Sequence, residues 1–453
     1  MSGTRPHALF VTAHFPPDRG PATHRVLRFV THLCAAGWDV TVLTIAETAY
    51  RQGTPLDSAL LDRVPAAVRV VRTTVRRPVE RLAAWRDRSR RRRLRGAAPG
   101  TARAPGSAGP GTVSGPGGLA AALTDVLSLP DRDIGWYGPA VAAGRRVFAE
   151  RPVDVIVSSA PPFTAHLVAR RLSRSAHVPW VADFRDPWSR APWARAKRST
   201  SWQGWVHRTL ERRTVHAARR VVLNTSRMRE DFAAHYRDLP DDRFVAVPNG
   251  YDADVLRPVA GTLPPPAGPV ALTHAGTLYG ARNPSVLFRA LRQLADAGRL
   301  PADALRVQLL GAVSGSFGAR AMVADLQLHA HVVFLAPVPH AEALHTLASS
   351  HALLLFQQGT DLQVPAKLYE YVGLRRPIIA VAPRPSAVAD VVEGTGLGVV
   401  VLPDDVEGLA ASLERVVRGE TLATPDDAVI AAYDGDWLGR QFVDLLEHAR
   451  RDA

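Results

Sequence analysis

Hydrophobic residues along this chain occur in two patterns. Some form short continuous runs of strand length, and others recur at helical spacing. Short apolar runs such as HALFVTA at residues 7–13 and WDVTVLTI at 38–45 flank a segment, 23–37, whose apolar residues share one helical face. Those residues are Val26, Leu27, Val30, Leu33 and Cys34. Similar strand-like runs follow at 153–160, 178–184, 219–226 and 244–250. The alternation of strand, helix and strand predicts a doubly wound domain with a parallel sheet.

A second series of the same kind begins after GTLPPPAGP, a proline-rich break that reads as part of a linker at residues 258–269. Its strand-like runs lie at 270–276, 305–312, 332–338, 351–357, 377–383 and 398–403. The predicted fold is therefore α/β, with two Rossmann-like doubly wound domains, residues 1–257 and 270–430, facing a cleft. Residues 431–453 are expected to form a C-terminal helix, with packing back on the first domain as one arrangement. Ligands of such sheets bind beyond the carboxyl ends of the strands.

Composition places the chain among globular proteins of a reducing compartment. It has 453 residues, of which 46% are hydrophobic, so it can bury more than one core. The single cysteine, Cys34, cannot form an internal disulfide and lies in an apolar helical pattern. The N-terminal apolar run is too short for a membrane span or a signal peptide. We therefore expect a cytoplasmic protein.

Positive charge is concentrated in one segment. The net charge is +14, and ten arginines lie between Arg76 and Arg95 against only Glu80 and Asp87. A Gly/Pro-rich stretch follows, so residues 76–118 read as a basic insertion. The chain has no recognition helix, zinc-ligand pattern or RNA-binding aromatics, so nucleic acid is not an expected partner. An anionic membrane surface at the inner face and a merely solvated insertion both stay open.

The segment QVPAKLYEYVGLRRP carries the most informative candidate site. Lys367 and Glu370 lie three residues apart, on one face of a helix that opens at Pro365. The start of such a helix favours an anion, the lysine can neutralise phosphate, and the carboxylate can accept hydrogen bonds from a sugar diol. A nucleotide is the predicted ligand. An ordinary surface helix with an i,i+3 ion pair is the alternative.

Two glycine-containing loops are candidate phosphate contacts. Gly20 lies in FPPDRGPATHR, between the first strand and the first helix, where the backbone can approach a ligand closely. This loop is not a GxGxxG fingerprint, which argues against NAD. In HAGTLYGARNP, Gly276 ends a strand and Arg282 precedes a helix, so the guanidinium can bind a diphosphate.

The segment VPWVADFRDPW places Asp183, Arg185 and Asp186 after a buried strand, where charged residues often face a site. A capping aspartate or an internal ion pair with Arg185 is the alternative. Tryptophans alternate with basic residues in the following segment, and they suit either a bilayer interface or packing onto their own domain. They are Trp188, Trp193, Trp202 and Trp205.

Taken in order along the chain, these motifs resemble the retaining glycosyltransferases of family four, which have the GT-B fold. The resemblance spans FVTAHFPPDRGPATHRVLRF, SSAPPFTAHL, VPWVADFRDPW, VPNGYD, HAGTLYGARNP, VPAKLYEYVGLRRP and VVVLPDD. It implies that Glu370 binds the nucleotide ribose, that Arg282 and Lys367 bind the donor diphosphate, and that Gly20 lies near that phosphate. It also implies sugar transfer with retention, from a UDP- or GDP-sugar to a glycan or lipid-linked glycan, with no cofactor and no obligatory metal. The VPAKLYEY form resembles a branch that builds bacterial surface polysaccharides.

Three positions depart from the family pattern. Leu362 stands where members commonly carry a glutamate, with Asp361 adjacent, and Thr277 replaces an arginine. A common histidine is matched by Ser159, with His166 further on. We expect Ser159, His166, Asp186 and Asp361 on the acceptor or sugar side, and Asp183 as a catalytic residue that positions the acceptor. A sugar-nucleotide epimerase and a non-catalytic sugar-nucleotide-binding subunit are the alternative functions.

Overall fold

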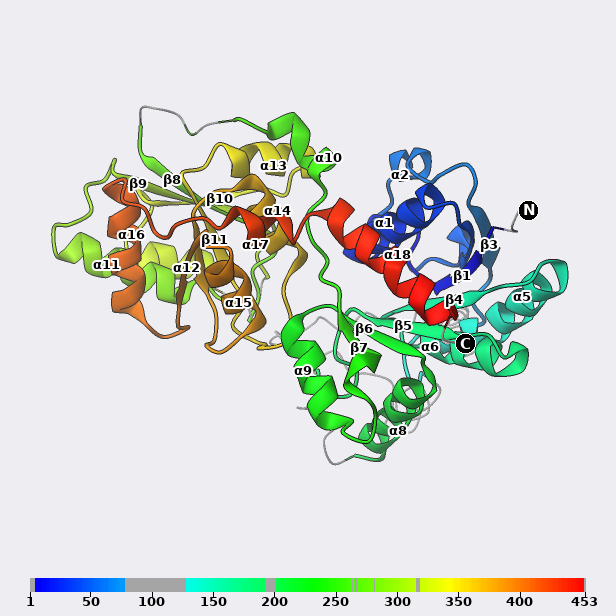
Figure 1. The fold of residues 1–453 in the computed structure, drawn as a ribbon. Helices are drawn as coiled ribbons and strands as arrows, with labels where there is room; N and C mark the ends of the chain where they lie inside the picture. Colours follow the sequence, from blue (N-terminus) through cyan, green and yellow to red (C-terminus); the bar gives the residue numbers. More distant parts are fainter. Residues whose placement is uncertain are drawn as a thin grey trace, which may run out of the picture. The chain divides into compact units, whose positions relative to one another are not determined.

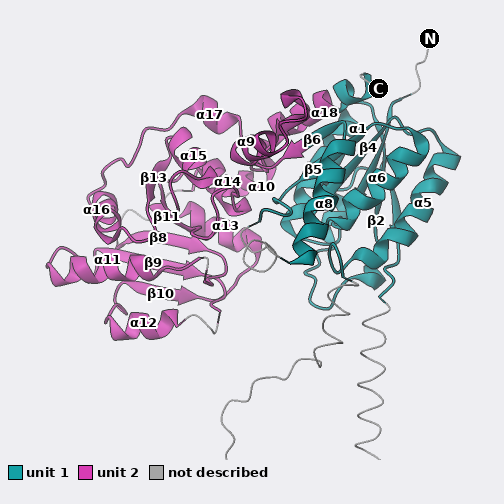
Figure 2. Ribbon diagram, turned by 90° about the horizontal axis from the view of Figure 1, so that it is seen from below, with its two compact units in different colours: residues 1–221, 446–453 teal, residues 222–445 magenta. Residues whose placement is uncertain are grey.

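The computed structural model describes residues 5–77, 128–191, 201–262, 264, 268–280, 282–314 and 318–451. The basic insertion therefore lies outside the described residues apart from Arg76 and Arg77, as does Trp193. The chain divides into two compact units, one of residues 1–221 with 446–453 and the other of residues 222–445 (Figure 2). The boundaries expected at 257 and 270 remain predictions.

The first sheet has seven strands in the order β3-β2-β1-β4-β5-β6-β7 (Figure 1). The registers among its first five strands are parallel, with Phe10 opposite Val42 of β2 and Val157 of β4. The strands are β1 (His7–Thr12), β2 (Asp39–Ile45), β3 (Arg69–Thr73), β4 (Val155–Ala160), β5 (Trp180–Phe184), β6 (Arg220–Leu223) and β7 (Phe244–Ala246). The division between the units falls inside β6.

Helices cover the first sheet on both faces, as its uniformly apolar central strands require. They include α1 (Pro21–Ala35), α5 (Tyr137–Glu150), α6 (Thr164–Ala176), α8 (Trp202–Ala217) and α9 (Ser226–His235), with shorter turns η1 (Glu47–Ala49), α2 (Ala59–Asp62) and η2 (Ile134–Trp136). Helix α1 begins after Gly20 with Pro21 at its first position, where a missing N–H costs nothing. Its apolar face is buried as expected, but Arg25 is buried with it.

The second sheet has six strands in the order β10-β9-β8-β11-β12-β13, and all of its pairs are parallel. They are β8 (Val270–Ala275), β9 (Leu305–Leu310), β10 (Val332–Leu335), β11 (Ala352–Phe356), β12 (Ile378–Val381) and β13 (Gly398–Val401). A short segment before it holds η3 (Asp241–Arg243), α10 (Ala253–Leu256) and η4 (Arg257–Val259).

Two apolar cores lie on opposite faces of the second sheet. Helices α11 (Ser285–Asp296), α12 (Ala319–Asp325) and α16 (Val406–Val417) form one core. Helices α13 (His340–Ala348), α14 (Ala366–Leu374) and α15 (Ala387–Gly394) form the other. Alternate side chains of β11 enter each core, Leu354 one and Leu353 the other. The chain ends with α17 (Asp427–Ala431) and α18 (Gly435–Arg451).

The predicted fold class is confirmed, since both sheets are Rossmann-like with alternating strands and helices. Within the described residues, no helix combines the length and the apolar character needed to cross a membrane.

Candidate functional site

Lys367 lies in the first turn of α14, directly beneath the loop that leaves β8. Its Nζ donates a hydrogen bond to the carbonyl oxygen of Ala275, at the carboxyl end of β8. The next residue, Gly276, has φ +135°, and a Cβ built there would lie 1.9 Å from the Lys367 Nζ. The lysine ammonium therefore occupies space that only a glycine at position 276 leaves free.

The ammonium of Lys367 is held in an unfavourable environment. Burial lowers its pKa first, the charge of Arg282 lowers it further, and Glu370 only partly compensates, so the pKa of Lys367 falls to about 7. No described residue shares a salt bridge with Lys367. An added anion at this place would relieve the repulsion between the two cations.

Arg282 is positioned by the loop that follows β8. Its backbone N–H donates to the Tyr279 carbonyl at 2.7 Å, and its guanidinium carbon lies 5.2 Å from the centre of the Tyr279 ring. Its Nε lies 3.4 Å from the Gln357 Oε1, just beyond β11, which leaves most of the guanidinium donors available.

Glu370 lies one turn further along α14 than Lys367. Its Oε1 is 2.9 Å from the His340 Nε2 at the start of α13, and its side chain is 30% exposed. The adjacent Tyr371 is buried, and its hydroxyl accepts from the Ala275 N–H at 3.1 Å and donates to the Leu354 carbonyl at 3.4 Å. Burial raises the pKa of Tyr371 far above its usual value. Tyr371 thus fixes α14 against β8 and β11 and sets the position of both charged side chains.

His274 is a residue of this region that sequence reasoning missed. It is fully buried near the end of β8, and its Nδ1 lies 3.0 Å from the Leu354 carbonyl. Its Nε2 has no hydrogen-bond partner among the described residues. Burial first, and then the charge of Lys367, lower the pKa of His274 well below its ordinary value. The ring is therefore neutral, so Nδ1 donates and Nε2 presents a lone pair.

The segment that approaches α14 contains Leu362, where the resemblance implies a glutamate. Leu362 is buried, and its carbonyl accepts from the Thr225 Oγ1 at 2.7 Å. Asp361 next to it is exposed, and Pro365 is the N-cap residue of α14. The position at which the resemblance implies a glutamate is therefore apolar and packed in this chain.

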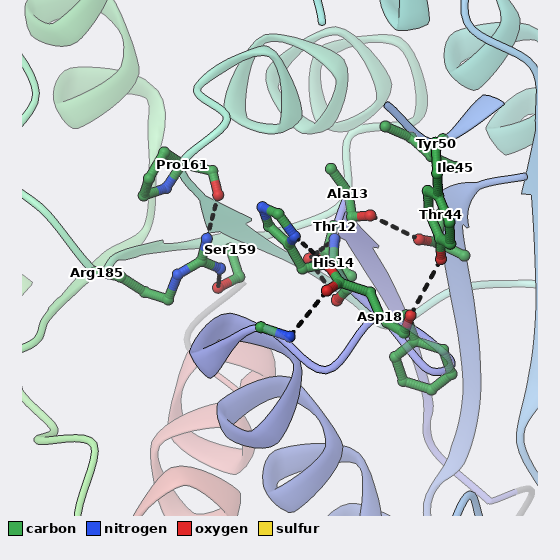
Figure 3. Close-up of polar contacts among 12 residues, drawn as sticks. Thr12, Ala13, His14, Asp18, Thr44, Ile45, Tyr50, Ser159, Pro161 and Arg185 are labelled. Atoms are coloured by element: carbon green, nitrogen blue, oxygen red, sulfur yellow. Dashed lines mark hydrogen bonds and ion pairs between the residues drawn. The ribbon is translucent and has the colours of Figure 1, made fainter. Parts of the chain in front are cut away.

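A second polar cluster lies at the carboxyl ends of β1, β4 and β5 (Figure 3). Asp183 is fully buried, and it accepts from the Arg25 guanidinium at 2.7 Å and from the Ser159 Oγ at 2.6 Å. Arg185 donates to the same Ser159 Oγ at 2.8 Å and to the Pro161 carbonyl. Burial alone would raise the pKa of Asp183, but the charge and hydrogen bonds of Arg25 outweigh it, so this pKa is lowered. Asp186, beside it, is partly exposed.

The loop containing Gly20 is organised by Asp18. One carboxylate oxygen of Asp18 lies 2.5 Å from the His14 Nδ1, and the other accepts from the Gly20 N–H at 2.8 Å (Figure 3). Burial opposes the charge on Asp18, but hydrogen bonds from His14 and Gly20 lower its pKa overall. The half-exposed His14 and the N-terminus of α1 are thereby held in one orientation.

His166 is enclosed by aromatic side chains rather than open to solvent. Its ring centre is 4.4 Å from that of Phe184, and its Nδ1 lies 2.7 Å from the Ser158 Oγ. Burial lowers the pKa of His166 to about 3, so it stays neutral. The stacked Phe163 and Trp188 rings, 4.4 Å apart, close the same cluster.

A family model described as a glycosyl transferase 4-like domain matches residues 20–250, a little more than half of the chain. The chain belongs to that family. The match begins at Gly20 and covers the Asp183 cluster and the tryptophan-rich segment. No curated protein matches the sequence of this glycosyltransferase.

Solved glycosyltransferases share its fold. Anabaena HepE in complex with UDP is similar with a TM-score of 0.61 and 15% identity, over 98% of this chain and 100% of that chain. A glycosyltransferase from Rickettsia africae gives 0.60 and 11%, over 100% of both chains. The lipopolysaccharide outer core galactosyltransferase WaaB, in its apo form, gives 0.60 and 12%, over 98% of this chain and 99% of that chain. These similarities show a GT-B fold.

The structure of this glycosyltransferase groups the predicted site residues into two sets. One set lies around β8 and α14 in one unit and consists of Gly276, Arg282, Pro365, Lys367 and Glu370. The other set lies in the other unit: Ser159 and Asp183 lie at the carboxyl ends of β4 and β5, Asp186 follows β5, and Gly20 precedes α1. In the described part of the chain, no three histidine, cysteine, aspartate or glutamate side chains gather closely enough to hold a metal. Sequence reasoning missed Arg25, Asp18 and His274. A signal for Arg25 existed, because it breaks an otherwise apolar face of α1.

Proposed function

We propose that this glycosyltransferase transfers a sugar, with retention, from a nucleoside diphosphate sugar to an acceptor hydroxyl of a cell-surface glycan or glycolipid. The observation that carries the proposal is the pair of cations, Lys367 and Arg282, at the N-terminal end of α14. Their mutual repulsion is relieved by a diphosphate, and the helix end adds further positive potential. HepE, which has the same fold, is described in complexes with UDP and UDP-glucose, which supports a nucleotide-sugar donor.

In this proposal, Lys367 and Arg282 are catalytic residues that stabilise the departing diphosphate. The bond between the anomeric carbon and the diphosphate oxygen breaks, and its electron pair leaves on the phosphate. The acceptor oxygen bonds to the same face of that carbon, and its proton passes to the departing diphosphate. Cations that are already in place when charge develops lower the barrier without reorganisation. Two cations can serve this role without a metal, so we propose metal-independent transfer.

The remaining site residues have binding or positioning roles in this proposal. Glu370 accepts hydrogen bonds from the ribose diol, for which its partly exposed carboxylate is suited. Asp183 and His166 are fully buried, so we assign them to positioning the loops after β4 and β5 rather than to direct contact with an acceptor. Ser159 joins Asp183 to Arg185 in that network, and Asp186 and Asp361 remain candidates for sugar contacts.

A screen of the purified protein against UDP- and GDP-sugars by thermal shift tests the proposal. Donor binding is expected to raise Tm. At a donor concentration a hundred times Kd, the free energy of unfolding should rise by about 2.7 kcal/mol. Product anomeric configuration, read by NMR from a transfer reaction, then tests retention. Absence of any shift with all donors would contradict the donor site, whereas an inverted product would contradict only the stereochemistry.

The apolar Leu362 supports a second candidate function, a sugar-nucleotide-binding subunit without transferase activity. Such a protein would show the donor-induced rise in Tm but neither transfer nor donor hydrolysis. Incubation with the donor alone also tests the epimerase alternative, because an epimerase would convert the donor sugar without any acceptor. We propose a cytoplasmic location at the inner face of the membrane, where lipid-linked acceptors are accessible.

A further inference from the structure

Unit 1 (residues 1–221 with 446–453) has a pocket whose lining contains none of the site residues predicted from the sequence. Its volume is about 350 Å³, and it lies where α6 is flanked by α5 and α8 (Figure 2). Part of its lining is apolar and comes from all three neighbouring segments, namely Ile134, Tyr137, Leu167 and Leu210. The pocket can therefore accept a hydrocarbon portion of a ligand.

The rest of the lining is cationic. Arg170, Arg171 and Arg174 of α6 complete the wall, and no described residue forms a salt bridge or hydrogen bond with any of them. The Arg170 Nε is buried and has no acceptor. Burial lowers the pKa of Arg170, and the charges of Arg174 and Arg213 lower it further. Within the described ranges, no carboxylate neutralises the three arginines that line the pocket.

Three unpaired guanidiniums beside an apolar floor match an amphiphilic anion. A guanidinium group binds phosphate through a fork of N–H donors. A bound phosphate would therefore supply the acceptor that the Arg170 Nε lacks among the described residues. A soluble polyanion would leave the apolar floor uncovered, whereas a phospholipid places glycerol and acyl carbons directly behind its phosphate. The chemistry of this pocket therefore favours a lipid phosphate.

The neighbouring helix α8 presents the side chains that proteins place at a bilayer interface. Trp202 and Trp205 are 53% and 62% exposed, the most exposed tryptophans among the described residues. Trp202, Val206 and Leu210 follow one another at intervals of four, so Trp202 lies on the side of α8 that also lines the pocket. Tryptophan rings are favoured at headgroup depth.

We propose that this pocket binds the phosphate of an anionic membrane phospholipid, with Trp202 and Trp205 inserted among the headgroups. The site is separate from the donor site, and it does not depend on the proposed sugar transfer. It also differs from the basic insertion at residues 76–118, because its lining residues lie between Ile134 and Leu210. Its role would be to hold the enzyme at the surface where lipid-linked acceptors are found.

Co-sedimentation of the full-length protein with vesicles tests this proposal. Vesicles of phosphatidylcholine are compared with vesicles containing about one third phosphatidylglycerol, and only the anionic vesicles are expected to retain the protein. The variant Arg170→Gln/Arg171→Gln/Arg174→Gln should lower the partition coefficient about 100-fold, since each arginine near such a surface contributes about a fivefold factor. The variant Trp202→Ala/Trp205→Ala should lower it by a smaller factor.

The matched control is Arg289→Gln/Arg306→Gln/Arg440→Gln, which removes the same charge from exposed positions of the other unit. It should bind vesicles almost as well as the wild type. Equal losses in the two triple variants would show that net charge alone drives binding, and would overturn the pocket. The ratio of wild-type to triple-arginine-variant partition coefficients should be unchanged when Arg90 to Arg93 are also replaced by serine in both proteins. Free energies of separate contacts add.

A competition experiment distinguishes a lipid from a free phosphate. Glycerol phosphate or inorganic phosphate at millimolar concentration should leave most of the protein on the anionic vesicles. Release of the protein by these soluble anions, or equal binding to phosphatidylcholine vesicles, would overturn the proposal. A thermal shift with UDP-sugars in the triple arginine variant should match the wild type, so failure of the donor site and failure of the lipid site give different results.

Discussion

The polar clusters of the two sheets contain similar residues but differ in their charge balance. Around Asp183, each cation meets an anion or a hydroxyl, and the Arg25 and Asp183 side chains are 1% and 0% exposed. Around Lys367, the charge of Arg282 opposes that of the ammonium, and the nearby carboxylate of Glu370 pairs with His340. The first cluster is complete without a ligand, and the second is not. The same sheet edge can thus serve as an internal brace in one unit and as an anion site in the other.

The largest effect is expected from breaking the complete cluster. Replacing Asp183 by alanine leaves Arg25 buried without its carboxylate, so we expect a loss of about 3–5 kcal/mol in the free energy of unfolding. Urea unfolding measures it. Asp254→Ala is the control, because its ion pair with Arg257 has side chains 72% and 76% exposed and should be nearly neutral. A loss below about 1 kcal/mol for Asp183→Ala would contradict the role of this cluster as a brace.

Removing Lys367 should reduce activity strongly without lowering stability, in contrast to the loss of stability expected for Asp183→Ala. We expect Lys367→Ala to reduce kcat/KM by about 100- to 1,000-fold, because it removes one stabilising group for the departing diphosphate. Tm should stay constant or rise, since an unfavourably buried ammonium is gone. Steady-state kinetics and a thermal melt measure the two effects. Unchanged turnover at saturating donor and acceptor would show that Lys367 does not act on the leaving group.

Gly276→Ala should displace the Lys367 ammonium without removing a charge from the cluster around it. The new Cβ would lie 1.9 Å from the Lys367 Nζ, so the ammonium must move, and we expect donor affinity to fall about 10- to 100-fold. Gly268→Ala is the matched control, because Gly268 also has a positive φ, +103°, but nothing within 4 Å of its added Cβ. Titration calorimetry measures both. Equal effects of the two substitutions would indicate backbone strain rather than displacement of Lys367.

The smallest expected effect is a dependence of donor affinity on pH. The pKa of Lys367 is about 7 in the free protein, and a bound diphosphate must raise it, so binding takes up a proton between the two pKa values. Affinity should be constant below about pH 7 and fall by up to tenfold per unit above it. Calorimetry in buffers of different ionisation enthalpy measures this proton uptake. Lys367→Ala should abolish the uptake, and a buffer-independent enthalpy in the wild type would refute the mechanism.

Sequence patterns predicted the fold closely because each strand and helix carries its own periodicity. The β1, α1 and β2 segments followed directly from apolar spacing, and both sheets were expected from the order of their elements. Apolar spacing and element order could not predict which charged residues of a site are paired or protonated. The ion pair of Arg25 with Asp183 joins residues 158 positions apart, and the neutral state of His274 depends on burial that only the folded chain supplies. Motif position located the candidate residues, but three-dimensional contacts decided which of them are already paired.

The fit of Lys367 against Gly276 has a consequence for the chemistry of the side chain itself. Lys367 and Lys197 are the only lysines in a chain whose other cationic side chains are nearly all arginine. An amine with a pKa of about 7 is largely an unprotonated nucleophile just above neutral pH, whereas an ordinary lysine remains protonated. Small amine-directed electrophiles should therefore acylate position 367 selectively, and a bound nucleotide should protect it. The glycine that makes room for the ammonium thus also makes Lys367 a position for selective covalent labelling in the proposed donor site.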